Sequence, residues 1–107
     1  MGVLFHGLSM WPFLQEADEL TVEPAGWDAL RPGDIVVYRL DDRFPALRIV
    51  RKLPTRLVLR GDHWVYRDCD AWPDDVLGRV VARRRGGRVL RHTDWEWRAR
   101  AAWALVD

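Results

Sequence analysis

Ser9 is the residue of this chain whose type and surroundings could do chemistry. It lies in Gly7-Leu8-Ser9-Met10-Trp11-Pro12, where Gly7 lets the chain turn and Pro12 restricts the local backbone. A serine becomes a nucleophile only when a neighbouring base removes its hydroxyl proton. A serine in a loop bounded by glycine and proline is more often structural, so both interpretations of Ser9 stay open at this point.

Three side chains could act as that base. Lys52 is the only lysine of the chain, and the other strongly basic residues are all arginines. His63 follows Asp62, whose carboxylate could orient a histidine, and His6 lies three residues before Ser9. Each has an ordinary alternative. Lys52 can be an exposed charge, Asp62 can cap a turn, and the histidines can be loop or strand-end residues.

The other reactive side chains do not form a recognisable site. Cys69 is flanked by two carboxylates, which disfavour the thiolate form that reacts. Residue types that bind metals occur, without the close spacing of a zinc site, at His63, Asp68, Cys69, Asp70 and His92. We therefore expect no cofactor and no metal.

Five segments resemble, in order, the signatures of the S24/S26 serine peptidase superfamily of signal peptidase I and LexA-like proteins. Residues 7–12 are similar to its G-x-S-M-x-P box, and residues 16–22 to its G-D-x-x-x-V segment, with Ala17 in place of glycine. Residues 31–37, 59–62 and 76–81 are similar to the G-D-I-V-V, K-G-D and V-x-G-x-V elements. Each match alone is weak, and their common order over residues 5–82 makes the resemblance specific.

The resemblance implies a coiled, mostly antiparallel β fold and a serine endopeptidase with Ser9 as the nucleophile. Such enzymes bind an extended peptide as an added strand and select its side chains in shallow pockets. The residues expected to contact the substrate are Met10, Trp11, Pro12 and Leu47. Trp64 and Trp72 could also line a groove for an apolar peptide, although such tryptophans are more often partly buried core.

Leu47 is the main departure from the family. The family's lysine or histidine base immediately precedes an arginine, and the matching pair here is Leu47-Arg48. One hypothesis is an active peptidase that acts in trans on an extended peptide or precursor segment, with Lys52 or His63 as a relocated base. In a regular strand Lys52 points to the face opposite Leu47, and a bulge would change that. The other hypothesis is a pseudo-peptidase that has kept the groove and binds a peptide or partner protein.

The elements that would position these residues are mostly strands. Alternating or β-branched runs predict strands at residues 3–5, 19–23, 35–40, 44–51, 56–60, 76–82 and 88–91. Hairpin turns are expected at 41–42 and 86–87, and an irregular loop over 63–75. A helix over about 94–106 follows, capped by Thr93 or Asp94. We expect it to dock on the sheet, or else to bind a partner, through Trp95, Ala99, Ala102, Trp103 and Val106.

Composition sets the remaining limits. The 107 residues fit one domain over 1–107, and 49% hydrophobic residues suffice for a core. The net charge of +1 and the acidic residues of the segment 68–75, which offset the basic run Arg83-Arg84-Arg85, argue against nucleic-acid binding. A single cysteine, no apolar run long enough to span a membrane and no secretory signal at the start predict a cytoplasmic protein. The sequence predicts no particular oligomeric state.

Overall fold

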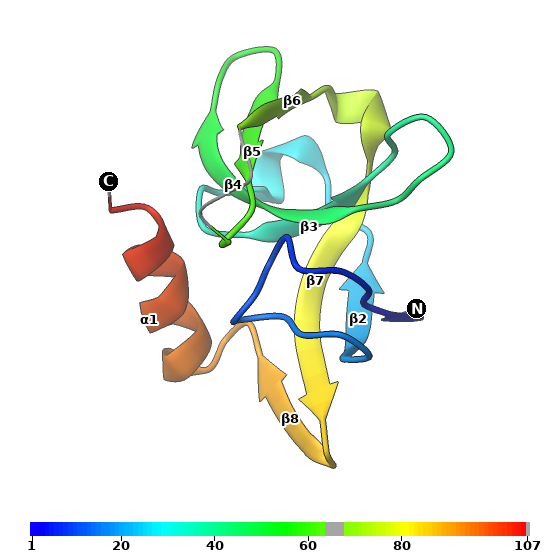
Figure 1. Ribbon diagram of the computed structural model, residues 1–107. Coiled ribbons are helices and arrows are strands. Elements are labelled where there is room, and N and C mark those ends of the chain that lie inside the picture. Colours follow the sequence, from blue (N-terminus) through cyan, green and yellow to red (C-terminus); the bar gives the residue numbers. More distant parts are fainter. Residues whose placement is uncertain (64–67, 107) are drawn as a thin grey trace.

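The computed structural model describes residues 1–63 and 68–106, which form a mainly β fold with one C-terminal α-helix (Figure 1). The elements are β1 (Gly2–Leu4), β2 (Glu19–Glu23), the 3₁₀ turn η1 (Trp27–Ala29), β3 (Ile35–Tyr38), β4 (Ala46–Lys52), β5 (Leu57–Arg60), β6 (Cys69–Ala71), the 3₁₀ turn η2 (Pro73–Asp75), β7 (Val76–Arg85), β8 (Arg88–Arg91) and α1 (Trp95–Ala104). The strands pair antiparallel throughout this described part. The predicted fold class, a mainly β antiparallel fold with a short C-terminal helix, is confirmed.

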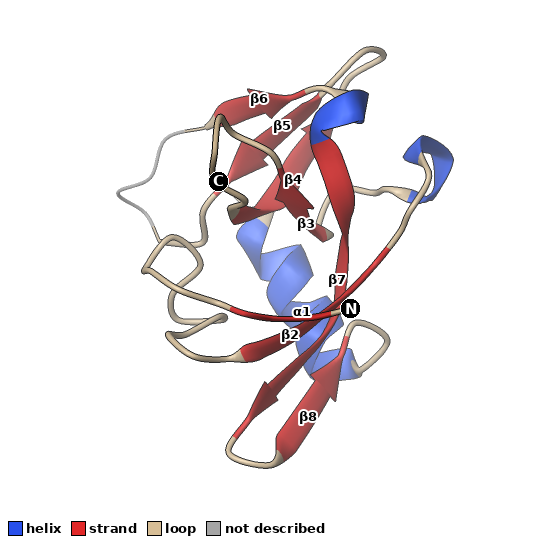
Figure 2. Ribbon diagram, turned by 90° about the vertical axis from the view of Figure 1, so that its right-hand side faces the viewer, coloured by secondary structure: helices blue, strands red, loops and turns tan. Residues whose placement is uncertain are grey.

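One coiled sheet follows the strand order β1-β2-β7-β3-β4-β5-β6, with β8 added beside β7. The long β7 connects its two parts, because β3 pairs with the first half of β7 and β8 with the second half. Figure 2 shows β3 to β6 gathered at one end of β7 and the β7–β8 hairpin at the other. Irregular pairing in β2, β3 and β4 adds to the coiling, since a bulge increases local twist.

Burial follows the alternation that the sequence predicts. Leu20 and Val22 of β2 are buried while the residues between and beside them are exposed. All four residues of β3, a central strand between β4 and β7, are buried, so both of its faces are covered. The most deeply buried apolar side chains of the strands are Ile35, Val36, Ile49, Leu57, Leu59, Ala71 and Val80.

The predicted hairpin turns at 41–42 and 86–87 are present, the first closed by a bridge between Leu40 and Arg43 and the second by the pairing of β7 with β8. Gly86 and Gly87 have φ of 57° and 79°, the left-handed conformation that a tight hairpin requires and that glycine adopts without strain. Gly33, in the turn before β3, has φ of 100°, and a Cβ built on it would lie 3.3 Å from the Cβ of Ala101. The turn before β3 is therefore packed directly against α1.

α1 is present, but the prediction of which face docks on the protein is wrong. The docked side carries Trp97, which is buried, and Ala101 and Leu105, which face Gly33. Trp95 and Trp103 of the predicted face are 76% and 68% exposed. The spacing of the large apolar residues identified a real stripe on the helix, but tertiary contact with Phe13 places Trp97 in the core instead.

A second correction concerns residues 63–75, for which we predicted an irregular loop. Residues Cys69–Ala71 form β6, which pairs with β5, and residues 73–75 form η2. The prediction for Trp64 falls outside the described residues. None of the helices in the described part of the chain is long and apolar enough to cross a membrane.

Candidate functional site

Ser9 lies in a loop that is closed at its base by the start of the sheet. The Phe5 N–H donates to Asp18 O at 2.9 Å, and the Ala17 N–H donates to Phe5 O at 2.8 Å. Met10 and Leu14 of the loop are completely buried, and Leu14 N–H donates back to Met10 O at 2.9 Å. These anchors fix the loop on the core and leave Ser9 half-buried at its surface.

Phe13 ties this loop to three other elements. The guanidinium carbons of Arg48 in β4 and Arg83 in β7 lie 5.2 and 5.0 Å from the centre of its ring. The ring of Trp97 in α1 meets it edge to face at 4.9 Å. The Phe13 carbonyl accepts hydrogen bonds from Arg83 and Arg85 at 2.6 and 3.2 Å. A shift of this loop would therefore disturb the sheet and the helix together.

Asp18 holds the far end of the loop. Its buried carboxylate accepts two hydrogen bonds of 2.7 Å from Arg85 and one of 2.8 Å from the Gln15 N–H. Burial by itself would raise the pKa of Asp18, but these hydrogen bonds and the charge of Arg85 outweigh it and hold that pKa below its ordinary value. Asp18 is therefore a charged structural anchor.

His6, the residue three positions before Ser9, is engaged on the outside of the loop. Its Nδ1 contacts the Glu16 carboxylate, which also accepts a 3.0 Å hydrogen bond from the Gly7 N–H. The Gly7 hydrogen bond, with the His6 contact next in importance, lowers the pKa of Glu16. The exposed His6–Glu16 pair therefore closes the loop, and the His6 ring is held at Glu16 instead of at Ser9.

Arg48 and Asp62 come from two of the segments that carry the family resemblance, and the structure joins them. Arg48 Nε and Nη2 each donate to the Asp62 carboxylate at 2.8 Å, and Arg48 Nη1 donates to Gly33 O at 2.8 Å. The two side chains are 0% and 3% exposed. Both carboxylate oxygens of Asp62, the residue that could orient a histidine or cap a turn, thus accept hydrogen bonds from Arg48.

His63 is the candidate base that the structure brings to Ser9. Its backbone N–H donates to the Ser9 carbonyl at 3.1 Å. Its ring lies 6.3 Å from that of Trp11, centre to centre, in an edge-on arrangement. The buried Arg48–Asp62 pair fixes the residue just before His63, so the ion pair and the Ser9 loop are connected through two successive residues.

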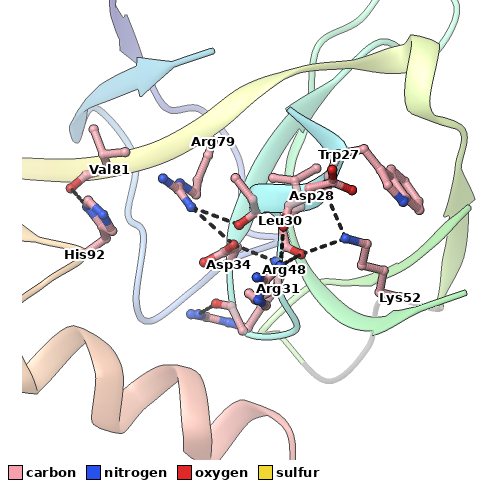
Figure 3. Close-up of polar contacts among 12 residues, drawn as sticks. Trp27, Asp28, Leu30, Arg31, Asp34, Arg48, Lys52, Arg79, Val81 and His92 are labelled. Atoms are coloured by element: carbon pink, nitrogen blue, oxygen red, sulfur yellow. Dashed lines mark hydrogen bonds and ion pairs between the residues drawn. The ribbon is translucent and has the colours of Figure 1, made fainter. Parts of the chain in front are cut away.

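Lys52 is held in a different place. β4 has an irregularity between Ile49 and Arg51, which is the bulge that could return Lys52 to the face of Leu47. Its ammonium, however, donates to the carbonyls of Trp27 and Leu30 at 2.7 and 3.2 Å and lies 4.8 Å from the centre of the Trp27 ring (Figure 3). Lys52 thereby closes the carbonyl end of η1, and its Nζ is directed to Trp27 and Leu30.

The four residues expected to contact a substrate divide into two groups. Met10 is completely buried and Leu47 is only 7% exposed, so their side chains pack in the core. Trp11 is 47% exposed and Pro12 is partly exposed, so both are accessible. Among the residues that the structure describes, none hydrogen-bonds to the Ser9 hydroxyl.

β1, the strand that leads into the Ser9 loop, lies at the edge of the sheet. Within the described chain it pairs only with β2. Met1, Val3 and Phe5 lie at the positions of β1 whose backbone groups hydrogen-bond to the neighbouring strand β2. Because these positions alternate along an antiparallel pair, the N–H and C=O groups of Gly2 and Leu4 point outward. Gly2 and Leu4 are exposed.

Sequence reasoning missed this edge. Two exposed apolar side chains belong to it, Leu4 at the end of β1 and Leu8 next to Ser9. Leu8 stands inside the box that identified Ser9, which was a usable signal. The pairing of Arg48 with Asp62 was also missed, although both residues belong to segments that carry the resemblance. We find no cluster of histidine, cysteine and acidic residues suited to a metal in residues 1–63 and 68–106.

Comparison with known proteins returned no matching family model, no matching curated protein and no matching solved structure.

Proposed function

We propose that this chain is a signal-peptidase-like and LexA-like domain that binds an extended peptide or partner segment beside Ser9 without cleaving it. The observation that carries the proposal is the free edge of β1, which runs directly into the Ser9 loop. A peptide strand added there would exchange main-chain hydrogen bonds with Gly2 and Leu4. This is the pseudo-peptidase hypothesis raised by the sequence, with its binding edge now named.

Exposed apolar side chains beside this edge support binding of a peptide with apolar residues. Leu4, Leu8 and Trp11 are each about half exposed, at 56%, 57% and 47%. Alternate residues of an added strand point to the same side, so a peptide on β1 would offer every second side chain to these contacts. Main-chain pairing would supply affinity, and these contacts would supply selectivity.

Loss of cleavage is supported by three observations on the residues expected to take part in it. Leu47 occupies the position of the family's base, the Lys52 ammonium is held by carbonyls of η1, and Asp62 is paired with Arg48. The second candidate function, a serine endopeptidase acting in trans, is favoured by one observation, the hydrogen bond between His63 N–H and Ser9 O. In that case His63 would serve as the base.

The binding edge can be tested with peptides selected from a displayed library of random nine-residue sequences. Leu4→Pro removes the outward N–H while leaving the pairing of Val3 and Phe5 with β2, and the control Leu4→Ala keeps that N–H. We expect Leu4→Pro to weaken the selected peptides at least about tenfold relative to Leu4→Ala, by fluorescence anisotropy. Equal affinities for the two variants, or failure to select any peptide, would contradict the proposal.

A further inference from the structure

α1 has two apolar sides, and within residues 1–63 and 68–106 only one of them packs into the core. Trp97 and Ala101 pack against Phe13 and Gly33. On nearly the opposite side, a continuous stripe of exposed residues consists of Trp95, Ala99, Ala102, Trp103 and Val106. We call these five residues the outer stripe. Figure 1 shows α1 at the side of the sheet.

The outer stripe continues into a cavity at the C-terminal end of α1. This cavity has a volume of about 230 Å³ and lies between the helix and the β4 bulge. Its walls combine apolar residues of β4 and α1, among them Val50 and Trp103, with the charged residues Arg60, Asp62 and Arg100. A cavity of about 150 Å³ can hold a benzene molecule, so this one has room for an aromatic side chain. Two of its walls, Trp103 and Val106, also belong to the outer stripe.

We infer that the outer stripe pairs with the same stripe of a second copy of this chain, in a two-fold symmetric, antiparallel arrangement. The sequence of residue sizes along α1 favours this occupant. Ala99 and Ala102 in the middle allow two helices to approach closely, and bulky residues stand at both ends. A two-fold rotation about that centre places Trp95 of one helix at the Trp103–Val106 end of the other. Trp95 of each copy then fills the cavity of its partner.

The charges beside the stripe are compatible with this pairing. Glu96 and Arg100 lie on the same flank, four residues apart, so reversing the second helix moves its Arg100 toward the Glu96 of the first, whose carboxylate also accepts hydrogen bonds from Arg88 of its own chain at 3.1 and 3.3 Å. The antiparallel arrangement also sets the two helix dipoles in opposite directions, which is favourable. Two exposed tryptophans and the flanking side chains of each copy would bury on the order of 1,000 Å² in total, the lower limit for a specific interface. The expected dimer is therefore weak and depends on protein concentration.

Sedimentation velocity of the full chain tests this inference, independently of peptide binding. We expect the wild type to shift from monomer to dimer between about 10 and 500 μM, as fits an interface of this size. Trp95→Ala removes the inserting side chain, and Ala104→Leu fills the cavity. Each should raise the dissociation constant at least about tenfold. The matched control is Trp72→Ala, because Trp72 is also half exposed but lies far from α1 in the sequence, at the start of η2.

Three results would overturn the inference. The first is a wild-type monomer over the whole concentration range. The second is a dimer that Trp95→Ala and Ala104→Leu leave unchanged, because association would then use another surface. The third is a monomer whose tryptophan fluorescence shifts on adding vesicles of phosphatidylcholine and phosphatidylglycerol, which would make the outer stripe a membrane-surface contact. Circular dichroism should show that each variant keeps the wild-type fold.

Discussion

The carboxylate of Asp62 and the guanidinium of Arg48 form a buried ion pair through two hydrogen bonds of 2.8 Å. Arg48 follows the position where the family carries its base, and Asp62 precedes His63, whose N–H donates to the Ser9 carbonyl. The pair therefore connects β4, the strand of Leu47, to the loop of Ser9. Its removal should damage the fold, whether or not Ser9 reacts.

The first prediction concerns the stability of this pair. Asp62→Asn leaves the Arg48 charge buried without its counter-charge, and we expect a loss of about 3–5 kcal/mol in the free energy of unfolding. Asp68→Asn is the matched control, because the Arg60–Asp68 pair is 36% and 44% exposed and such pairs contribute about 1 kcal/mol or less. Urea denaturation measures both. Similar losses in the two variants would show that the Arg48–Asp62 pair is not the anchor described.

The second prediction concerns the missing base. Leu47→His places an imidazole where the family has it, and a positioned general base is worth about 10²–10⁴ in rate. We expect a fluorophosphonate probe to label Ser9 at least about tenfold faster in this variant than in the wild type, as measured by intact mass. Leu47→Asn controls for adding a polar group, and Ser9→Ala combined with Leu47→His should abolish labelling.

The same labelling experiment separates the two candidate functions. Rapid labelling of the wild type that is lost in His63→Ala would support the endopeptidase with His63 as its base. Slow labelling of the wild type that His63→Ala does not change fits the peptide-binding proposal. The Leu47→His variant should be somewhat less stable, because the imidazole replaces a side chain in a position that is only 7% exposed.

The third prediction is a pH dependence that comes from Asp18. Its pKa is lowered in the folded protein, so the unfolded chain binds more protons in the acidic range. The stabilisation is complete above the ordinary aspartate pKa and is lost as the pH falls through the lowered one. Asp18→Asn should flatten the fall in unfolding free energy between about pH 5 and pH 2, measured with urea. The exposed Glu23→Gln serves as control, and an unchanged slope in Asp18→Asn would refute the assignment.

The fourth prediction concerns Ala17, which stands where the family usually has glycine. Its φ is 68°, a left-handed conformation that costs a residue with a Cβ about 1–2 kcal/mol. Part of that cost is offset because glycine makes the unfolded chain more flexible. Ala17→Gly should therefore raise the free energy of unfolding by about 1 kcal/mol or slightly less. Ala82→Gly within β7 should lower it by a similar amount, and stabilisation by both would contradict the argument.

The strands were predictable where local sequence determines burial. Glu19–Glu23 alternates polar and apolar residues, and β2 has those bounds. Glycines at 86 and 87 allowed the hairpin between β7 and β8 to be placed. β6 was not predictable in this way, because Cys69–Ala71 is short and contains a charged residue. It becomes a strand only through pairing with β5.

The site was less predictable because its contacts are tertiary. The sequence singled out Ser9 and Leu47 as candidate site residues. The contacts of Lys52 were not predictable, because they lie 22 to 25 residues away in the sequence, at the carbonyls of Leu30 and Trp27. The docked face of α1 was missed for the same reason. Spacing along the helix favoured the stripe with more apolar residues, while contact with Phe13 determined that Trp97 is buried.

Amide hydrogen exchange at Leu4, followed by NMR with and without a selected nine-residue peptide, tests the central claim most directly. The Leu4 N–H points out from the free edge of β1, so a peptide strand bound there must accept its hydrogen bond. We predict that the peptide slows exchange at Leu4 and is recovered uncleaved. Unchanged exchange at Leu4 with protection at β6 or β8 instead, or recovery of two peptide fragments that depends on Ser9, would contradict this account.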